Sequence, residues 1–139
     1  MIGKRKASAI ARAASDKKGR DIVIMDMRKV PSVSDYFVVS SGTSTTQVKA
    51  ISDNIRRVLR EKGEKLWHSE GEREALWIVL DYGDVVAHIF GEETRHFYDL
   101  EKLWSDIPQE RFREKTGKAV PRRKARVLKK KKKKKRARR

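Results

Sequence analysis

The sequence predicts an α/β (α+β) fold, in which a mixed β-sheet is flanked by helices. Two continuous apolar runs of strand length, Ile22–Met27 and Tyr36–Ser41, are typical of strands covered on both faces. Between residues 44 and 63 the apolar residues recur at helical spacing, and two more strand-like runs follow within residues 77–90. The order helix, two strands, helix, two strands, helix predicts one layered domain.

The helix expected after the second strand has start and stop signals. Ser44-Thr45-Thr46-Gln47 fits a capping box, in which the Ser44 hydroxyl accepts from the Gln47 amide and the Gln47 side chain reaches back. Gly63 ends the helix, because glycine readily adopts the left-handed conformation that closes helices. One apolar stripe recurs every three or four positions and consists of Val48, Ile51, Ile55, Val58 and Leu59.

Two strand-like runs surround a tight polar turn in the segment Trp77–Phe90. Strand side chains alternate between the two faces of a sheet. The members of the first run therefore divide into Trp77, Val79 and Asp81 on one side and Leu76, Ile78 and Leu80 on the other. One face of this strand carries a large aromatic side chain beside a carboxylate.

The segment Glu92–Trp104 is predicted as the last helix, with an apolar side of Phe97, Leu100, Leu103 and Trp104. It is dense in aromatic and charged residues, a mixture that suits a protein interface better than a dry core. Taken singly, Trp77, Tyr98 and Trp104 are equally compatible with ordinary core aromatics. Both interpretations stay open at this point.

The order of these residues matches a known pattern. Trp-x-x-x-Asp-Tyr-Gly-Asp-x-x-x-His-x-Phe at residues 77–90 is followed by Phe-Tyr-x-Leu-Glu-x-Leu-Trp at residues 97–104, and residues 18–26 and 34–44 continue the match upstream. On these motifs the chain resembles the ribosomal silencing factor family, also called the Iojap family, from about Asp16 to Trp104. The resemblance implies a nucleotidyltransferase-like fold, and a homodimer when the protein is free. The strands of this sequence lack the catalytic carboxylates of that fold, because they carry no Asp-x-Asp or Asp-x-Glu pair.

The resemblance also implies a function. It makes the chain a translational repressor that binds the large ribosomal subunit through ribosomal protein L-fourteen and sterically blocks subunit joining. We expect Trp77 and Tyr98 to be the apolar anchors of this partner-binding face, since Trp and Tyr dominate binding hot spots. The polar surround is expected to consist of Asp81, Tyr82, Asp84 and His88, with the carboxylates facing basic groups of a ribosomal protein.

A nucleotidyltransferase-like enzyme is one alternative. Such an enzyme needs a Gly-Ser turn over the phosphates and two carboxylates, alternate on one strand, that hold metal ions. Ser41-Gly42-Thr43-Ser44 imitates the turn but fits a helix cap as well. Asp21 and Asp26 are five residues apart, so they point to opposite faces of their strand. We therefore expect no catalysis.

No metal site and no cofactor are expected either. Three histidines are present, but their positions lack the spacing of metal ligands: His68, His88 and His96. The chain also lacks a phosphate-binding loop and a dinucleotide-binding fingerprint.

The charge is distributed unevenly along the chain. Residues 1–110 hold 18 basic and 18 acidic side chains, whereas residues 111–139 hold 18 basic and one acidic, so the C-terminal part carries the whole net charge of +17. Such a segment repels itself and has little to bury. We predict a ribosomal silencing factor domain at residues 1–110 and a disordered polybasic tail at residues 111–139.

Basic runs bind polyanions without sequence choice. We expect non-specific contact between ribosomal RNA and the tail, through Lys129, Lys130, Lys131, Lys132, Lys133, Lys134, Lys135 and Arg136. Two alternatives stay open for the tail. In the first, the protein is a general RNA-binding protein that acts through the tail. In the second, the tail is an appendage with no role in docking.

The compartment is predicted from what the sequence lacks. No cysteine occurs among the 139 residues, which excludes disulfides and agrees with a reducing compartment. No apolar run approaches the roughly 20 residues that span a bilayer, so no membrane contact is expected. Residues 1–15 are basic and rich in Ala and Ser like a transit peptide, but they lie where the family has its first helix. We interpret them as that helix and expect a bacterial cytoplasmic protein.

Overall fold

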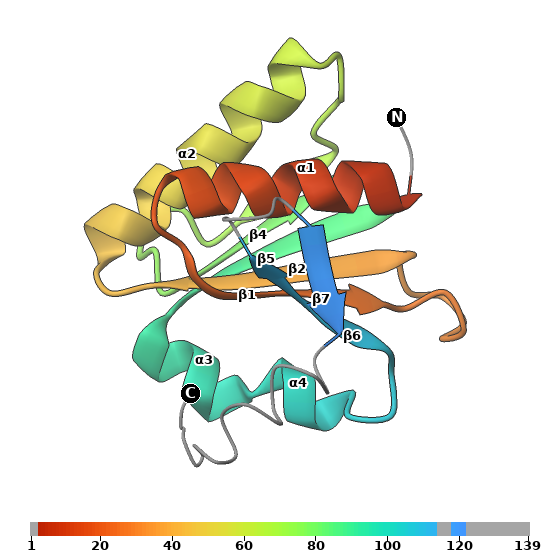
Figure 1. Cartoon of the computed structure of the whole chain (residues 1–139). Coiled ribbons are helices and arrows are strands. Elements are labelled where there is room, and N and C mark those ends of the chain that lie inside the picture. The colour runs from red at the N-terminus through yellow and green to blue at the C-terminus, as the bar shows by residue number, and fades with distance from the viewer. Residues whose placement is uncertain (1–2, 114–117, 122–139) are drawn as a thin grey trace.

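The computed structural model describes residues 3–113 and 118–121. Within these residues, seven strands form one mixed sheet in the order β3-β4-β5-β2-β1-β6-β7, with helices on both of its faces (Figure 1). The predicted fold class is confirmed. The elements are α1 (Gly3–Asp16), β1 (Arg20–Asp26), β2 (Tyr36–Gly42), α2 (Thr45–Glu61), β3 (His68–Glu70), β4 (Trp77–Asp81), β5 (Val85–Gly91), α3 (Glu92–Tyr98), α4 (Leu100–Leu103), β6 (Gln109–Arg113) and β7 (Lys118–Pro121).

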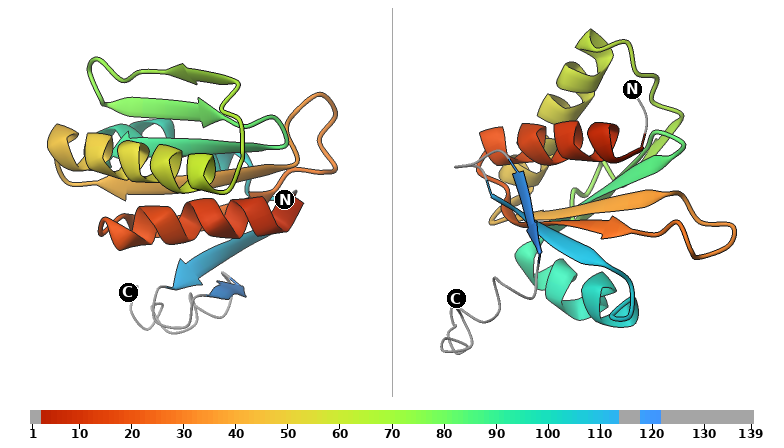
Figure 2. Two further views of the ribbon diagram at one scale, coloured as in Figure 1. Left: turned by 90° about the horizontal axis from the view of Figure 1, so that it is seen from above. Right: turned by 45° about the vertical axis from the view of Figure 1, so that its right-hand side comes forward.

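The central strands are buried on both faces, as their continuous apolar runs predict. β2 pairs in parallel with β5, and the other strand pairs are antiparallel. Along β1, Ile22 and Ile24 belong to the core beneath α1 and α2, whereas Val23 and Met25 belong to the core on the opposite face. α1 and α2 run side by side over the first face, and α3 and α4 lie against the second (Figures 1 and 2).

Alanines let α1 approach the sheet and α2 closely. Ile10 is the one large aliphatic residue on its buried side, which otherwise consists mainly of Ala7, Ala11, Ala13 and Ala14. Small side chains shorten the distance at which two backbones can pack. The buried Asn54 amide of α2 then donates to the Ala13 carbonyl at 2.8 Å, which ties the two helices together.

The boundaries of α2 follow the predicted signals with one difference. The Ser44 hydroxyl accepts from the Gln47 amide at 3.1 Å, as expected for an N-cap. The Gln47 side chain, however, reaches one residue further back than Ser44, because its oxygen accepts from the Thr43 amide at 2.6 Å. At the other end Gly63 adopts φ 81°, and its amide donates to the Arg60 carbonyl as in a Schellman motif.

The single helix predicted for Glu92–Trp104 is wrong. Asp99 adopts φ 43° and divides the segment into α3 and α4, and its carboxylate accepts from the Lys102 amide to begin the second helix. The break rotates the apolar residues relative to one another. Leu100 and Trp104 pack on the sheet, whereas Phe97 and Leu103 are exposed.

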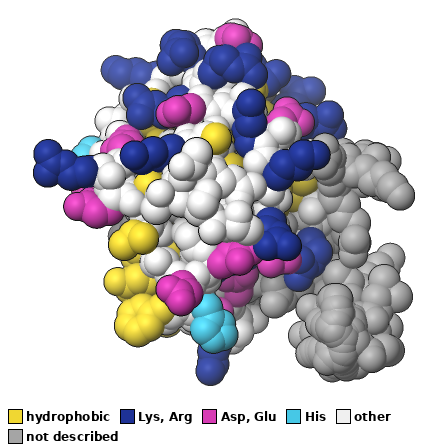
Figure 3. Space-filling view, turned by 90° about the vertical axis from the view of Figure 1, so that its left-hand side faces the viewer, with side chains coloured by type: hydrophobic (Ala, Val, Ile, Leu, Met, Phe, Trp, Pro, Cys, Tyr) yellow, Lys and Arg dark blue, Asp and Glu magenta, His cyan; other side chains and the backbone are white. Residues whose placement is uncertain are grey.

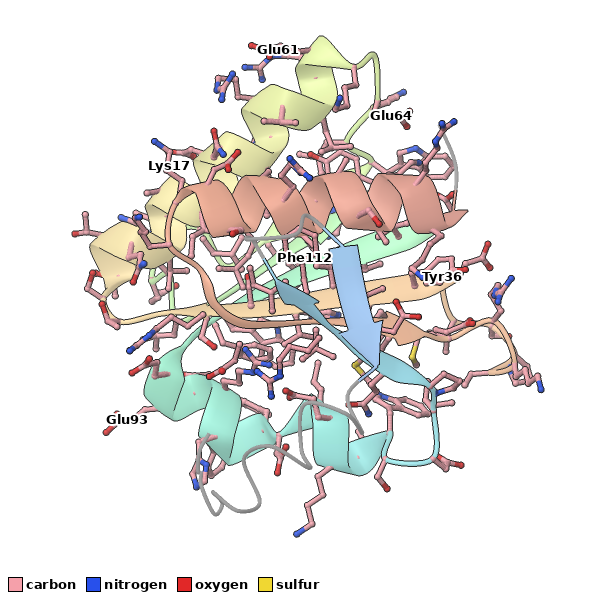
Figure 4. All side chains as sticks on the ribbon, in the orientation of Figure 1. Lys17, Tyr36, Glu61, Glu64, Glu93 and Phe112 are labelled. Carbon is pink, nitrogen blue, oxygen red and sulfur yellow. The ribbon has the colours of Figure 1, made fainter. Side chains whose placement is uncertain are left out.

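The sheet continues beyond residue 110, so the predicted domain boundary is too early. β6 pairs with β1, and the Phe112 ring is buried in the core beneath α1 (Figure 4). One apolar residue among charged neighbours produces no strand pattern, which is why β6 and β7 were not predicted. The tail lysines and arginines at 122–139 lie outside the described residues. No helix in the described part is long and apolar enough to cross a membrane.

Candidate functional site

An aromatic cluster lies where β4, β5 and α3 meet, on the face of the sheet opposite α1 and α2. Trp77 of β4 is paired with Phe90 of β5, and their rings stack with centroids 4.8 Å apart. The ring of Tyr98, the last residue of α3, lies 4.7 Å from the Trp77 ring. Trp77 is half-buried in this arrangement. It is therefore both part of the packing and accessible to a partner.

His88 lies beneath this cluster instead of at its polar rim, where the sequence placed it. The Trp77 indole Nε1 donates to His88 Nδ1 at 3.1 Å, and the Phe37 ring meets the imidazole edge to face at 4.6 Å. Only 8% of His88 is exposed. Burial lowers the pKa of His88 to about 4, so the ring is neutral near pH 7.

An exposed hydrophobic patch adjoins the cluster. Leu76 is 53% exposed, Phe97 79% and Tyr98 48%. Together with Glu93 and two polar neighbours they line a hollow of about 480 Å³. Figure 3 shows hydrophobic side chains gathered low on this face beside acidic side chains and a histidine, while Lys and Arg dominate its upper part. Glu93 projects outward from α3 (Figure 4).

The sequence did not assign Leu76 and Phe97 to this face. Alternation along the strand predicted that Leu76 lies on the same face as the buried Ile78. In the structure β4 begins only at Trp77, and Ala75, the residue before Leu76, adopts φ 57°. The left-handed residue ends the alternation, so Leu76 turns outward. Phe97 was expected to pack and is released by the helix break at Asp99.

Asp81 lies on the same face as Trp77, as the alternation predicts. Its carboxylate accepts from the Gly83 amide at 2.8 Å and so stabilises the β4–β5 turn. The side chain is half-buried at the end of the strand away from Tyr98. One carboxylate of the predicted polar surround is therefore on the aromatic face.

The structure does not bring Tyr82 and Asp84 together with Trp77. Tyr82 is 2% exposed and belongs to the core beneath α1 and α2, where burial raises the pKa of its phenol. Asp84 accepts from the Lys6 ammonium at 2.7 Å and from the Gly3 amide at 2.8 Å. The reason is the two-residue period of the strand, which turns Tyr82 to the face opposite Asp81.

Comparison with known proteins identifies what kind of molecule carries this face. A family model described as "Ribosomal silencing factor during starvation" matches residues 3–139. The ribosomal silencing factor RsfS of Bacillus subtilis is 43% identical over 98 residues, which are 70% of this chain and 83% of that protein. The corresponding protein of Halalkalibacterium halodurans is 38% identical over 96 residues, 69% of this chain and 82% of that protein.

A solved structure agrees with these relatives. A crystal structure of a Chromobacterium violaceum protein superposes with a TM-score of 0.73 at 34% identity and covers 76% of this chain and 88% of that one. This chain belongs to the ribosomal silencing factor family. The predicted family membership is confirmed, and with it a role in ribosome-associated regulation of translation.

The Ser-Gly-Thr-Ser turn of this ribosomal silencing factor is a helix cap. The Ser41 hydroxyl accepts from the buried Arg95 guanidinium at 2.7 Å, and Ser44 caps α2. The carboxylates weighed for metal binding are on the surface, where Asp21 pairs with Arg111 and Asp26 with Arg28. Among the described residues no group of three or more His, Asp or Glu side chains could hold a metal ion.

Proposed function

We propose that this ribosomal silencing factor docks on the large ribosomal subunit through its aromatic face and blocks subunit joining. The face, called the docking face below, consists of Leu76, Trp77, Asp81, Phe97 and Tyr98. The observation that carries the proposal is the continuity of a half-buried Trp with an exposed apolar patch. Exposed apolar patches beside polar rims mark interaction sites, and buried Trp and Tyr anchors dominate binding energies.

The chemistry of the docking face favours a protein as its direct partner. Its apolar side chains are flanked by the carboxylates of Asp81 and Glu93, which repel phosphates. The hollow between Leu76 and Phe97 can receive an apolar side chain. A partner with an apolar anchor among basic residues satisfies both features. We assign this partner to ribosomal protein L-fourteen, in line with the family resemblance.

Silencing then works by mass action without any covalent step. A factor bound where the small subunit would contact the large one stabilises the free large subunit by RT ln(1 + [L]/Kd). Joining is reduced in proportion to the occupied fraction. The protein accordingly acts as a repressor in the cytoplasm and needs neither catalytic residues nor a cofactor.

The free protein is expected to be a homodimer. An apolar face that is exposed in one chain is stabilised by burial against a second copy. If the dimer contact uses the docking face, a second copy and the ribosome compete for that face.

The polybasic tail assists docking in this proposal. Its positive charge attracts ribosomal RNA without sequence choice and raises the association rate, while the docking face selects the site. A general RNA-binding protein is the second candidate function, favoured by the net charge of +17 alone.

Subunit sedimentation tests the proposal. Purified large and small subunits are mixed at a magnesium concentration that permits joining, with and without the protein, and are resolved on a gradient. We expect joined particles to decrease as protein is added and the protein to travel with the large subunit. An unchanged joined peak at saturating protein would refute subunit exclusion.

A further inference from the structure

His88 is a buried side chain at the docking face that a partner does not touch directly. His88 is 8% exposed, and its ring lies against Phe37 and the half-buried Trp77. Any contribution of His88 to docking must therefore act through a neighbouring side chain.

The Trp77 indole is that neighbour. Its Nε1 donates to His88 Nδ1 at 3.1 Å. A ring nitrogen that accepts a hydrogen bond carries no proton, so the neutral imidazole holds its proton on Nε2. Within the described residues Nε2 is buried and has no hydrogen-bond partner. A buried donor without a partner is unfavourable, and a purely apolar side chain of similar size would avoid it.

The hydrogen bond adds a constraint on the indole that stacking does not supply. Phe90 lies 4.8 Å from the Trp77 ring and Tyr98 4.7 Å. Stacking fixes the plane of an indole, but a half-turn about the Cβ–Cγ bond keeps that plane and exchanges the two edges of the ring. A hydrogen bond from Nε1 is possible for only one of these two orientations. His88 thus sets the rotation of the indole. A surface that is ordered before binding loses less entropy when the partner arrives.

We propose that His88 is a positioning residue of the docking face, which fixes the Trp77 indole in the orientation that a ribosomal protein contacts. This inference rests on the docking function proposed above. It also gives a reason for a polar side chain among rings, since Nδ1 supplies the acceptor that the indole N–H uses.

Two substitutions separate positioning from packing. His88→Asn keeps an acceptor close to the position of Nδ1 but is smaller, and His88→Leu has a similar size but no acceptor. If His88 only fills space, the Leu variant should be both more stable and tighter in binding than the Asn variant. If His88 positions the indole, the Asn variant should bind purified large ribosomal subunits more tightly than the Leu variant. We then expect His88→Leu to bind at least about tenfold more weakly than wild type and His88→Asn to stay within about threefold of it.

Affinity is measured by co-sedimentation and stability by chemical denaturation on the same preparations. The inference is overturned if His88→Leu binds with wild-type affinity. It is also overturned if the more stable of the two variants is the tighter binder. If the wild-type protein itself does not bind large subunits, the docking function fails and the inference fails with it. If wild type binds and His88→Leu binds equally, the inference alone fails.

Nitrogen NMR of the wild-type protein keeps the inference testable if His88→Asn does not fold. At pH 7 we expect Nδ1 of His88 to resonate as an unprotonated nitrogen and Nε2 as a protonated one. The indole N–H of Trp77, assigned through Trp77→Phe, should exchange slowly with solvent. A proton on Nδ1 overturns the inference, because the indole would then have no acceptor.

Discussion

At the scale of single residues, the burial of an aromatic side chain decides whether its substitution measures stability, partner binding or both. Trp77 packs on Phe90 and also contacts Tyr98, so under the proposed docking its removal would affect both folding and binding. Of the two interpretations that the sequence left open, the ring contacts show the packing role, and the role of interface anchor stays a prediction. Tyr98 is 48% exposed and gives a cleaner measure of docking.

Tyr98→Ala should weaken binding to the large subunit by about 2 kcal/mol, or roughly thirtyfold, if Tyr98 is an anchor. Its free energy of unfolding should change by about 1 kcal/mol or less, because half of the side chain is already in water. Co-sedimentation and chemical denaturation measure the two quantities. Leu103→Ala is the control, since this apolar side chain is 66% exposed on α4 and does not belong to the docking face. Equal losses in the two variants would contradict the assigned face.

The buried His88 also predicts how stability depends on pH. Its pKa is lowered from 6.5 to about 4 in the folded protein, so the unfolded chain binds the proton more readily. The resulting stability is present above pH 6.5 and is lost as the pH falls towards 4. His68 contributes with the opposite sign, because its hydrogen bond to Glu70 raises the pKa of that imidazole.

Comparison with His88→Leu isolates the contribution of His88. Between pH 6.5 and 4.5 the wild-type protein should lose about 2 kcal/mol more unfolding free energy than the variant. Denaturant titrations at the two pH values measure this difference. Identical pH dependence in both proteins would show that His88 is not a buried neutral base.

At the scale of elements, a cluster of charges attaches the N-terminus of α1 to the β4–β5 turn. The Lys6 ammonium lies 2.7 Å from Asp84 and 3.1 Å from Glu64, and Asp84 also accepts from the Gly3 amide. Burial raises the pKa of Asp84, but the Gly3 amide and Lys6 outweigh it, and the net pKa is lower than usual. A carboxylate at a helix N-terminus is further favoured by the helix dipole.

Asp84→Ala should therefore destabilise the fold by about 2–3 kcal/mol, because it leaves Lys6 short of a partner in a buried position. The loss should shrink in acid, since the wild-type carboxylate loses its advantage as it becomes protonated. Thermal or denaturant unfolding at pH 7 and at pH 3 checks both statements. Asp81→Asn is the control and should cost less than Asp84→Ala. For the same reason Asp84→Lys is not expected to fold normally and is unsuitable as a probe of docking.

At the scale of the whole molecule, the proposal separates charge from recognition: the net positive charge lies in the tail, and the docking face lies in the body. Removal of residues 122–139 takes away 14 positive charges and no negative one, which leaves a net charge of +3. β7 ends at Pro121, so the cut spares the sheet. Non-specific RNA binding should nearly vanish, and the slope of log affinity against log salt should shrink by about 0.7–0.9 for each phosphate that the tail no longer neutralises.

The truncated protein should still prevent subunit joining, although more of it is needed at low salt. A variant in which Lys129 to Lys135 are replaced by serine keeps the length of the tail and separates charge from bulk. Gradient sedimentation across a salt series measures both proteins. Complete loss of silencing at every concentration, with an intact fold, would make the tail the specific element.

The sequence by itself determined the fold class, the central strands, both ends of α2 and the family. These features depend on local rules: apolar runs, helical spacing, a capping serine and a closing glycine each act within a few residues. The alternation along β4 likewise put Trp77 and Asp81 on one face. The tail's charge is a property of composition and does not depend on the fold.

Only the tertiary structure decided how the docking face is composed. Leu76 turns outward because Ala75 ends the strand, and Phe97 is released because Asp99 breaks the last helix. His88 is buried because Trp77 and Phe37 lie against it from neighbouring strands. The exposure of a side chain depends on which distant segments of the chain cover it. The sequence pattern of its own strand or helix therefore does not determine it.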